Sequence, residues 1–310
     1  MTKERGRRPP GGSGGSLPRA DTLFAIAAGA ALTAYNNVFG LHPWHSRWYV
    51  RLNAGATGAA LAAATLGGLT AADLGVGRGR WLPGRLGSGL ATGAAAGWLL
   101  IAAVPATRPL LDDNRVAGLD RRAVTYQALI RIPVGTALWE ETAFRGVLQA
   151  ALRRVMPGTA AILVTSGLFG AWHIRPTVQA LRVNGLAEDR RRALAGTLAG
   201  VAGTAAGGVL LSWLRERTGR LAAPVLLHAA VNSGALIAAV LARAASRPRN
   251  PTVLARAASR PRNPHGASPG ERPPGTPRWP RPRSFVTGPW PGRLRRRHSH
   301  PSAGLPAERA

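Results

Sequence analysis

The sequence of 310 residues contains no cysteine, which excludes disulfide bonds, a thiolate nucleophile and zinc sites built on cysteine. Acidic residues are also scarce. The 13 aspartates and glutamates stand against 41 lysines and arginines, which gives a formal net charge of +28. Alanine, glycine and arginine are abundant along the whole chain, as in proteins from GC-rich genomes. The charge therefore does not indicate a specific nucleic-acid partner, and we expect none.

Long apolar runs are what the sequence has in abundance. Its mean hydropathy of −0.01 averages an interior rich in Ala, Leu, Gly and Val with flanks rich in Arg, Pro, Gly and Ser. A helix rises about 1.5 Å per residue, so about 20 apolar residues cross the roughly 30 Å of membrane hydrocarbon. The pattern predicts an all-α, polytopic transmembrane helix bundle of about 7–8 helices. The runs are 22–40, 52–74, 87–106, 123–152, 159–174, 194–213 and 221–241.

The composition divides the chain into three parts. A transmembrane domain at 21–242 is flanked by a basic N-terminus at 1–20 and an Arg/Pro-rich tail at 243–310, both predicted to be disordered. The polar, aromatic segment 41–51 is predicted to be a loop at the membrane interface. The basic start predicts a cytoplasmic N-terminus. Seven crossings would then put the equally basic tail on the other side of the membrane. A run that does not cross, a hidden eighth crossing and a tail that violates the charge rule all stay open.

Two adjacent carboxylates and an arginine interrupt the run 123–152. A charge in hydrocarbon costs roughly 2.5–3.5 kcal/mol on insertion scales, so Glu140, Glu141 and Arg145 need an explanation. Glu141 and Arg145 are one helical turn apart and can pair, whereas Glu140 is rotated by about 100°. One carboxylate is then neutralised, and its neighbour stays free to act as a general base. The alternative is that both glutamates only bridge basic side chains.

Two later runs carry further polar side chains. His173 stands at the end of the run 159–174, where a single histidine is more often an interface residue than a catalytic one. His228 and Asn232 lie one turn apart on one face of the run 221–241, where they could equally hold helices together by hydrogen bonds. Together with the glutamates, these residues can converge from three helices on one cavity. A carboxylate, two imidazoles and an amide suit the activation of a water molecule.

The polar residues form three short motifs in a fixed order. The first motif is Glu140-Glu141-x-x-x-Arg145, and its fuller form, Glu-Glu-x-x-Phe-Arg-Gly, spans Glu140 to Gly146. The second motif is Phe169-x-x-x-His173, and the third is His228-x-x-x-Asn232. Each motif is short, but the ordered set resembles the CPBP family, the CAAX protease and bacteriocin-processing (Abi) intramembrane endopeptidases. This family is related to the type II CAAX prenyl endopeptidases. The resemblance covers roughly residues 123–241.

The resemblance implies an integral membrane endopeptidase, expected in the plasma membrane of a bacterium. Glu140 would act as base on a water, assisted by His173, while His228 and Asn232 would stabilise the oxyanion of the tetrahedral intermediate. The expected catalytic residues are Glu140, Glu141, His173, His228 and Asn232, with Arg145 and Phe169 as structural support.

The sequence gives no certain cofactor. It lacks His-Glu-x-x-His, the strongest zinc motif. Glu140, His173 and His228 could still serve as ligands of a divalent metal such as zinc. A glutamate-type and a metal-dependent mechanism therefore both stay open, and we favour the first. The expected partners are the lipid bilayer and a peptide or protein substrate, and whether that substrate is lipidated is also open.

Two other functions fit parts of the sequence. A non-proteolytic membrane protein of the same fold could act as an immunity or partner-binding factor. A transporter or proton-coupled channel would also use buried carboxylates and histidines. Against the latter, the polar residues within the runs are few, and no second copy of the glutamate motif is visible.

Overall fold

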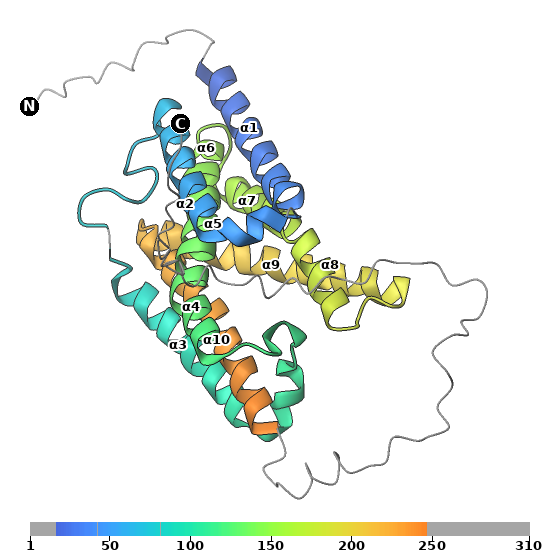
Figure 1. Ribbon diagram of the computed structural model, residues 1–310. Coiled ribbons are helices and arrows are strands. Elements are labelled where there is room, and N and C mark those ends of the chain that lie inside the picture. Colours follow the sequence, from blue (N-terminus) through green and yellow to red (C-terminus); the bar gives the residue numbers. More distant parts are fainter. Residues whose placement is uncertain (1–16, 42, 81, 247–310) are drawn as a thin grey trace, which may run out of the picture. The chain divides into compact units, whose positions relative to one another are not determined.

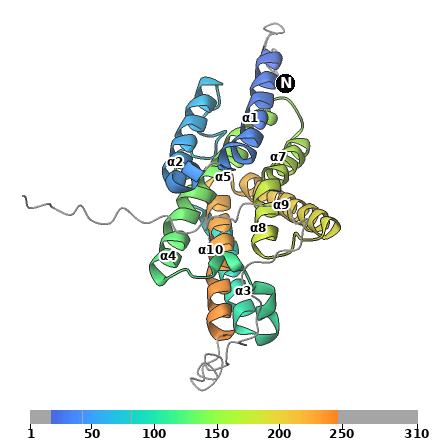
Figure 2. The same cartoon turned by 45° about the vertical axis from the view of Figure 1, so that its right-hand side comes forward.

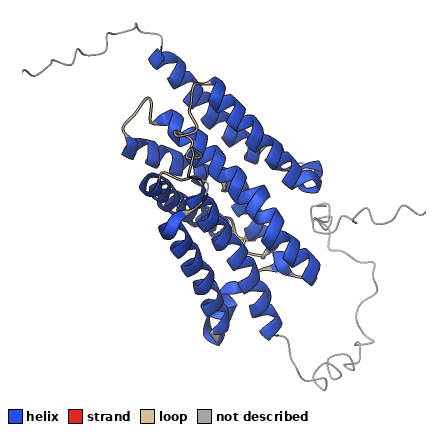
Figure 3. Ribbon diagram, turned by 90° about the vertical axis from the view of Figure 1, so that its left-hand side faces the viewer, coloured by secondary structure: helices blue, strands red, loops and turns tan. Residues whose placement is uncertain are grey.

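The computed structural model describes residues 17–41, 43–80 and 82–246, which belong to one unit of the chain, Met1–Arg262. Within these ranges the chain forms helices joined by loops, with no strand (Figure 3). The all-α prediction is therefore confirmed. Residues 17–20 and 243–246, which belong to the segments 1–20 and 243–310 predicted to be disordered, are helical. The other residues of both segments lie outside the described residues.

Helices of very different lengths follow one another along the chain (Figure 1). In order, the elements are α1 (Leu17–Asn37), η1 (Phe39–Leu41), α2 (Pro43–Leu66), α3 (Gly84–Ala103), η2 (Pro105–Leu111), η3 (Asn114–Val116), α4 (Arg121–Tyr126), η4 (Gln127–Leu138), α5 (Trp139–Glu141), η5 (Thr142–Leu148), α6 (Gln149–Leu152), α7 (Gly158–Trp172), α8 (Ile174–Val183), α9 (Arg190–Thr218) and α10 (Ala222–Ser246).

Three of the described helices, α3, α9 and α10, are long and apolar enough to cross a membrane. α3 and α10 lie side by side, and α9 packs against both α7 and α8 (Figures 1 and 2). These pairings bring segments together that are far apart in the sequence. Through these pairings, α7, α9 and α10 are placed in contact with residues 121–152.

The prediction of a loop at 41–51 is wrong, because α2 begins at Pro43 and continues through the segment. Proline suits the first turn of a helix, where its missing N–H would have no partner within the helix. The polar side chains that suggested a loop are instead paired inside the bundle. The hydroxyl oxygens of Tyr49 and Thr136 lie 2.9 Å apart, and His45 is buried.

The run predicted at 52–74 also differs from the observed helix. α2 ends at Leu66, and Gly68 adopts a φ of 75°, a left-handed conformation in which glycine carries no steric penalty. The apolar residues that follow lie in turns. Each of the other predicted runs falls on a helix, with its ends shifted by a few residues.

α4, η4, α5, η5 and α6 are consecutive pieces of one composite helix, residues 121–152. The helix begins at Asp120, whose carboxylate accepts a hydrogen bond of 2.7 Å from a backbone N–H in the first turn. η4 and η5 are wound as π-helix, a form often found at functional sites. Pro133 lies inside η4 and has no N–H to donate. In a π-helix that N–H would reach the carbonyl of Ala128, which instead accepts a hydrogen bond of 2.8 Å from the hydroxyl of Ser233 on α10. The carbonyl of Gly135 accepts a hydrogen bond of 2.7 Å from Asn53 on α2.

The largest buried apolar cluster joins the composite helix to α1, α2 and α7. Most of its buried members are Ala and Leu, and four are aromatic; the rings of Phe144 and Trp172 meet edge to face with centroids 5.4 Å apart. Rings of this size contribute much of the energy of core packing. The buried side chains of Glu140, Glu141 and Arg145 therefore lie next to apolar groups.

Gly87 allows α3 to approach α10 closely, which generates a stability prediction. A Cβ at Gly87 would lie 2.8 Å from the Cβ of Ala223, whereas a Cβ at Gly89 would meet nothing within 4 Å. Alanine favours a helix over glycine by up to about 1 kcal/mol, but overpacking costs about 1–3 kcal/mol. We expect Gly87→Ala to lower the Tm of the detergent-purified protein, measured by circular dichroism, and Gly89→Ala to keep or raise it. Equal Tm values for the two variants would contradict this account of the α3–α10 contact.

Candidate active site

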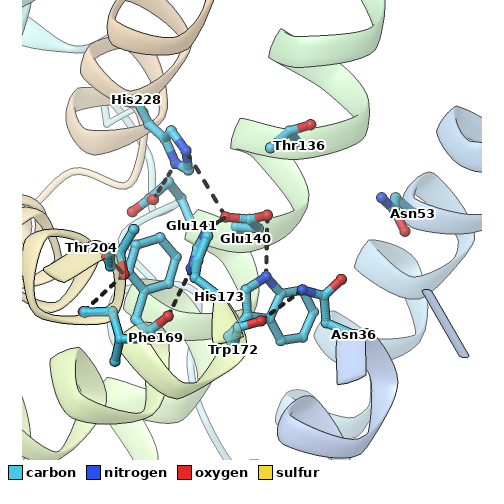
Figure 4. A network of polar contacts seen from close by, with 12 residues as sticks. Asn36, Asn53, Thr136, Glu140, Glu141, Phe169, Trp172, His173, Thr204 and His228 are labelled. Carbon is cyan, nitrogen blue, oxygen red and sulfur yellow. Dashed lines mark hydrogen bonds and ion pairs between the residues drawn. The ribbon is translucent and has the colours of Figure 1, made fainter. Parts of the chain in front are cut away.

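Glu140 and Glu141 lie on α5, between the two π-helical segments of the composite helix. Both side chains are buried, Glu140 being 5% and Glu141 0% exposed. A buried carboxylate is costly unless charged or hydrogen-bonding partners surround it. The two carboxylates have different partners, which Figure 4 shows from close by.

Glu141 shares one oxygen between two donors from different helices. Its Oε1 accepts hydrogen bonds from Nη1 of Arg145 at 3.0 Å and from Nδ1 of His228 at 2.7 Å. Arg145 also donates to the carbonyl of Gly208 on α9, and its guanidinium lies 4.1 Å from the centre of the Phe169 ring. The ion pair expected from the spacing of Glu141 and Arg145 is thus present. It connects the composite helix to α7, α9 and α10.

Glu140 points toward the C-terminal end of α7. Its Oε1 accepts a hydrogen bond of 3.3 Å from the indole N–H of Trp172. Its Oε2 faces two imidazole nitrogens, Nε2 of His173 at 3.8 Å and Nε2 of His228 at 3.9 Å (Figure 4). Although this Oε2 is buried, no described residue forms a hydrogen bond with it.

The second nitrogen of each imidazole is already engaged. Nδ1 of His173 lies 2.8 Å from the carbonyl oxygen of Phe169, and because a carbonyl can only accept, this Nδ1 carries the hydrogen. Nδ1 of His228 donates to the Glu141 carboxylate for the same reason. In a neutral ring, each Nε2 then has a lone pair on the side facing Glu140.

The separation between Glu140 and the two imidazoles has a chemical consequence. Distances of 3.8 and 3.9 Å exceed the usual range of a direct hydrogen bond, which ends near about 3.2 Å. Polar atoms at this spacing suit a bridging water. Such a water would donate to a carboxylate and to an imidazole together, and general-base catalysis requires this contact.

The predicted oxyanion residue Asn232 is not joined to this group. It lies one turn after His228 on α10 and is partly exposed. Its side chain forms no hydrogen bond with any residue in the described part of the chain. Of the residues predicted from the motifs, the structure brings together the two glutamates, both histidines, Arg145 and Phe169, and leaves Asn232 beside them.

A metal site was the alternative use of these side chains. Two imidazole nitrogens and a carboxylate oxygen are donor types that zinc accepts. In residues 17–41, 43–80 and 82–246, however, no group of three His, Asp or Glu side chains is arranged to hold a metal ion.

Sequence reasoning missed the contribution of α1 to the wall of the site. Trp172 stacks on Tyr35, with ring centroids 6.0 Å apart and an interplanar angle of 9°. The side-chain amide of Asn36 donates to the Trp172 carbonyl at 2.8 Å, and that of Asn37 donates to the Ala171 carbonyl at 3.3 Å. The end of α7 leaves such carbonyls without partners inside the helix. Two adjacent asparagines in an apolar run were the available indication, because each needs a partner there.

A second polar network fixes α1 and α2 next to the turn that precedes Glu140. Asn53, which donates to the backbone of η4, accepts a hydrogen bond of 2.7 Å from the hydroxyl of Tyr35. One residue further along η4, Thr136 is within 2.9 Å of the Tyr49 hydroxyl. Figure 4 shows Asn53 and Thr136 on neighbouring helices. The network explains why polar residues occur within the first two helices.

The comparisons with known proteins agree with this arrangement. Residues 123–234 match the family described as Type II CAAX prenyl endopeptidase Rce1-like, and this segment contains all three motifs. The resemblance to the CPBP family is therefore confirmed, and the match supports the fold of a CAAX-type membrane protease. Together with the apolar helices, it also supports an integral membrane protein. No curated protein and no solved structure matches the chain.

The buried pair of Arg145 and Glu141 yields a second stability prediction. Removing one partner of a buried ion pair leaves an uncompensated charge and costs about 3–5 kcal/mol. Arg153 serves as the control, because it also pairs with a glutamate, Glu216, but its side chain is 48% exposed. Such an exposed pair contributes about 0–1 kcal/mol to stability. We expect Arg145→Gln to lower the Tm in detergent strongly and Arg153→Gln to change it little, by tryptophan fluorescence. If both substitutions shifted the Tm equally, Arg145 would not have the buried role described above.

Proposed function

We propose that the protein is an intramembrane endopeptidase, which hydrolyses a peptide bond with a water activated by Glu140. The observation that carries the proposal is the position of Glu140 Oε2. It is buried, has no hydrogen-bond partner among the described residues, and faces the Nε2 atoms of His173 and His228 at 3.8 and 3.9 Å. The family match over residues 123–234 supports the reaction class.

In this mechanism Glu140 is the base. A water held between Oε2 and Nε2 of His173 loses a proton to Glu140 while its oxygen attacks the carbonyl carbon of the substrate. The electrons of the carbonyl double bond move to its oxygen, which becomes the oxyanion. Nε2 of His173 accepts a hydrogen bond from the second O–H of the water, which stays on the oxygen, and so orients the attacking lone pair. Protonated Glu140 then transfers its proton to the leaving amine, and the peptide bond breaks.

The oxyanion needs hydrogen-bond donors of its own. His228 can donate from Nε2 when its ring is protonated, and the carboxylate of Glu141 at Nδ1 stabilises that form. With His228 protonated, the net charge of Glu140, Glu141, Arg145 and His228 together is zero. This balance lowers the free-energy cost of keeping charged groups in hydrocarbon. The amide of Asn232, one turn along α10, is proposed as the second donor.

A metal-dependent reaction is the alternative within the same class. Bound zinc would act as a Lewis acid on the water, and Glu140, His173 and His228 are the residues that would hold it. Because the described residues contain no group arranged as metal ligands, we propose the glutamate-type reaction. The experiment below measures metal content so that the two can be separated.

The proposed substrate is a peptide or protein presented at the surface of a bacterial plasma membrane. Both lipidated and unmodified substrates are included, since recognition of a lipid group is itself part of the proposal to be tested. A non-proteolytic immunity or partner-binding factor of the same fold would not need a free carboxylate at Glu140, and this difference makes the two functions distinguishable.

The test is cleavage by the purified full-length protein in liposomes. A library of peptides with and without a C-terminal prenyl group is incubated with the wild type and with Glu140→Gln, and the products are identified by mass spectrometry. We expect Glu140→Gln to lose cleavage by at least about a hundredfold, because a general base contributes about 10²–10⁴-fold, and to keep the wild-type Tm within a few degrees. Metal content is measured on the same samples.

Glu188→Gln is the matched control, because Glu188 is an exposed glutamate between α8 and α9. It should cleave like the wild type. Cleavage by Glu140→Gln at the wild-type rate would overturn the proposal. Stoichiometric zinc, with activity lost to a chelator and restored by zinc, would replace the glutamate-type mechanism with the metal-dependent one.

Trp172 is predicted to position the base, because its indole N–H holds the other oxygen of Glu140. Trp172→Phe keeps an aromatic ring against Tyr35 but removes that donor. Losing one hydrogen bond is expected to lower kcat by about tenfold with KM nearly unchanged. Trp213→Phe, at an exposed position on α9, is the control and should behave like the wild type. A changed KM with an unchanged kcat would assign Trp172 to substrate binding instead.

A further inference from the structure

A cavity of about 410 Å³ lies where the C-terminal ends of the composite helix and of α9 meet the segment between α2 and α3. It is separate from the residues of the candidate active site. Three of its lining residues are arginines, namely Arg153, Arg154 and Arg215. Two carboxylates, Asp73 and Glu216, also line it. The cavity is therefore surrounded by more positive than negative side chains.

The arginines have more hydrogen-bond donors than their partners occupy. A guanidinium offers five N–H donors and no acceptor. Arg153 pairs with Glu216 through Nη1, and Arg215 donates from Nη2 to the backbone carbonyl of Asp73 at 2.7 Å. Arg154 donates to the carbonyls of Gly67 and Gly68, and it forms ion pairs with Asp21 at 3.3 Å and with Asp73 at 3.8 Å. Each of the three guanidiniums still has N–H groups that these partners do not occupy.

Arg215 is the most informative of the three. It is 8% exposed, and its Nε forms no hydrogen bond with any described residue. Leaving a donor of a charged group buried and unpaired costs free energy. The Nε atom itself lies against Gly75, but Arg215 lines the cavity, so an acceptor bound there would lie close to this buried charge.

The acidic residues do not supply that acceptor. Asp73 is engaged by Thr70, whose backbone N–H and hydroxyl donate to its Oδ2 at 2.8 and 2.7 Å. These hydrogen bonds keep the pKa of the Asp73 carboxyl below its usual value, so it remains charged at neutral pH. Glu216 is shared by Arg153 and Gln149. A further cation, Arg80, donates to the carbonyl of Gly219 at the cavity wall.

We propose that this cavity binds a phosphate group, carried either by the headgroup of an anionic lipid or by a free phosphate ion. The planar fork of a guanidinium matches the oxygens of phosphate and can bind them in pairs. A water occupies about 30 Å³ in the liquid, so the cavity has room for a phosphate with several waters. Arginines at the ends of membrane helices also lie where anionic headgroups gather. The proposal does not depend on peptidase activity, since binding is measured directly.

The test is calorimetric titration of the full-length protein in detergent. The probes are inorganic phosphate, dihexanoyl phosphatidic acid and, as the phosphate-free probe, dihexanoylglycerol. The variants are Arg153→Gln and Arg215→Gln. Arg190→Gln is the matched control, because Arg190 is an exposed arginine at the opposite end of α9.

We expect at least one phosphate probe to bind saturably to the wild type and to Arg190→Gln. Each cavity variant should weaken that binding about tenfold or more, because charge-assisted hydrogen bonds are lost. Binding of phosphatidic acid alone would identify a lipid headgroup, and binding of inorganic phosphate alone would identify a soluble anion. Should Arg215→Gln fail to fold, Arg153→Gln decides, since its side chain is half-exposed.

Three results would overturn the proposal. One is that neither phosphate probe binds the wild type. Another is that Arg153→Gln and the wild type bind phosphate with equal affinity. The third is that dihexanoylglycerol binds as tightly as phosphatidic acid, because recognition would then reside in the acyl chains.

Discussion

The carboxylate of Glu141 is the group on which the arrangement of the candidate site depends. It is fully buried and binds Arg145 on its own helix and His228 on α10, while Arg145 reaches the backbone of α9 and the ring of Phe169 on α7. Removing such charges from water costs several kcal/mol for each ion, so the cluster is tolerable only when its partners are in place. One buried anion thereby determines how the composite helix, α7, α9 and α10 meet. It also engages Nδ1 of His228 and leaves Nε2 of that ring toward Glu140.

The helices and the meeting of the motifs could be predicted because both depend on strong local constraints. An apolar run of membrane length has few alternatives to a helix. An acid and an arginine four residues apart in such a run have few alternatives to pairing. The distribution of Glu140, His173 and His228 over three runs then predicted a shared cavity, and the structure brings these side chains within 4 Å of one carboxylate oxygen. Their catalytic roles, and that of Asn232, stay predictions.

Other features depend on partners that no local pattern identifies. Polar and aromatic residues indicated a loop at 41–51, yet Tyr49 and His45 belong to a helix because their polar atoms find partners inside the bundle. Trp172 lies in an apolar run, and no local pattern indicates that its indole N–H donates to Glu140. The π-helical winding around α5 is equally invisible to the spacing of apolar residues, and Asn53 of another helix donates to its backbone. The partners of all these residues lie on other helices.

The asparagine side chains of α1 that donate to carbonyls at the end of α7 have a consequence for biosynthesis. Asn36 and the carbonyl it binds are 136 positions apart in the chain, and a growing polypeptide emerges from its N-terminus. The first helix is therefore made long before its acceptor is translated. A buried amide without a partner costs free energy, so Asn36 has to stay in contact with water or another partner until α7 is made. Closure of the wall beside Glu140 is accordingly a late event, after most of the protein has been made.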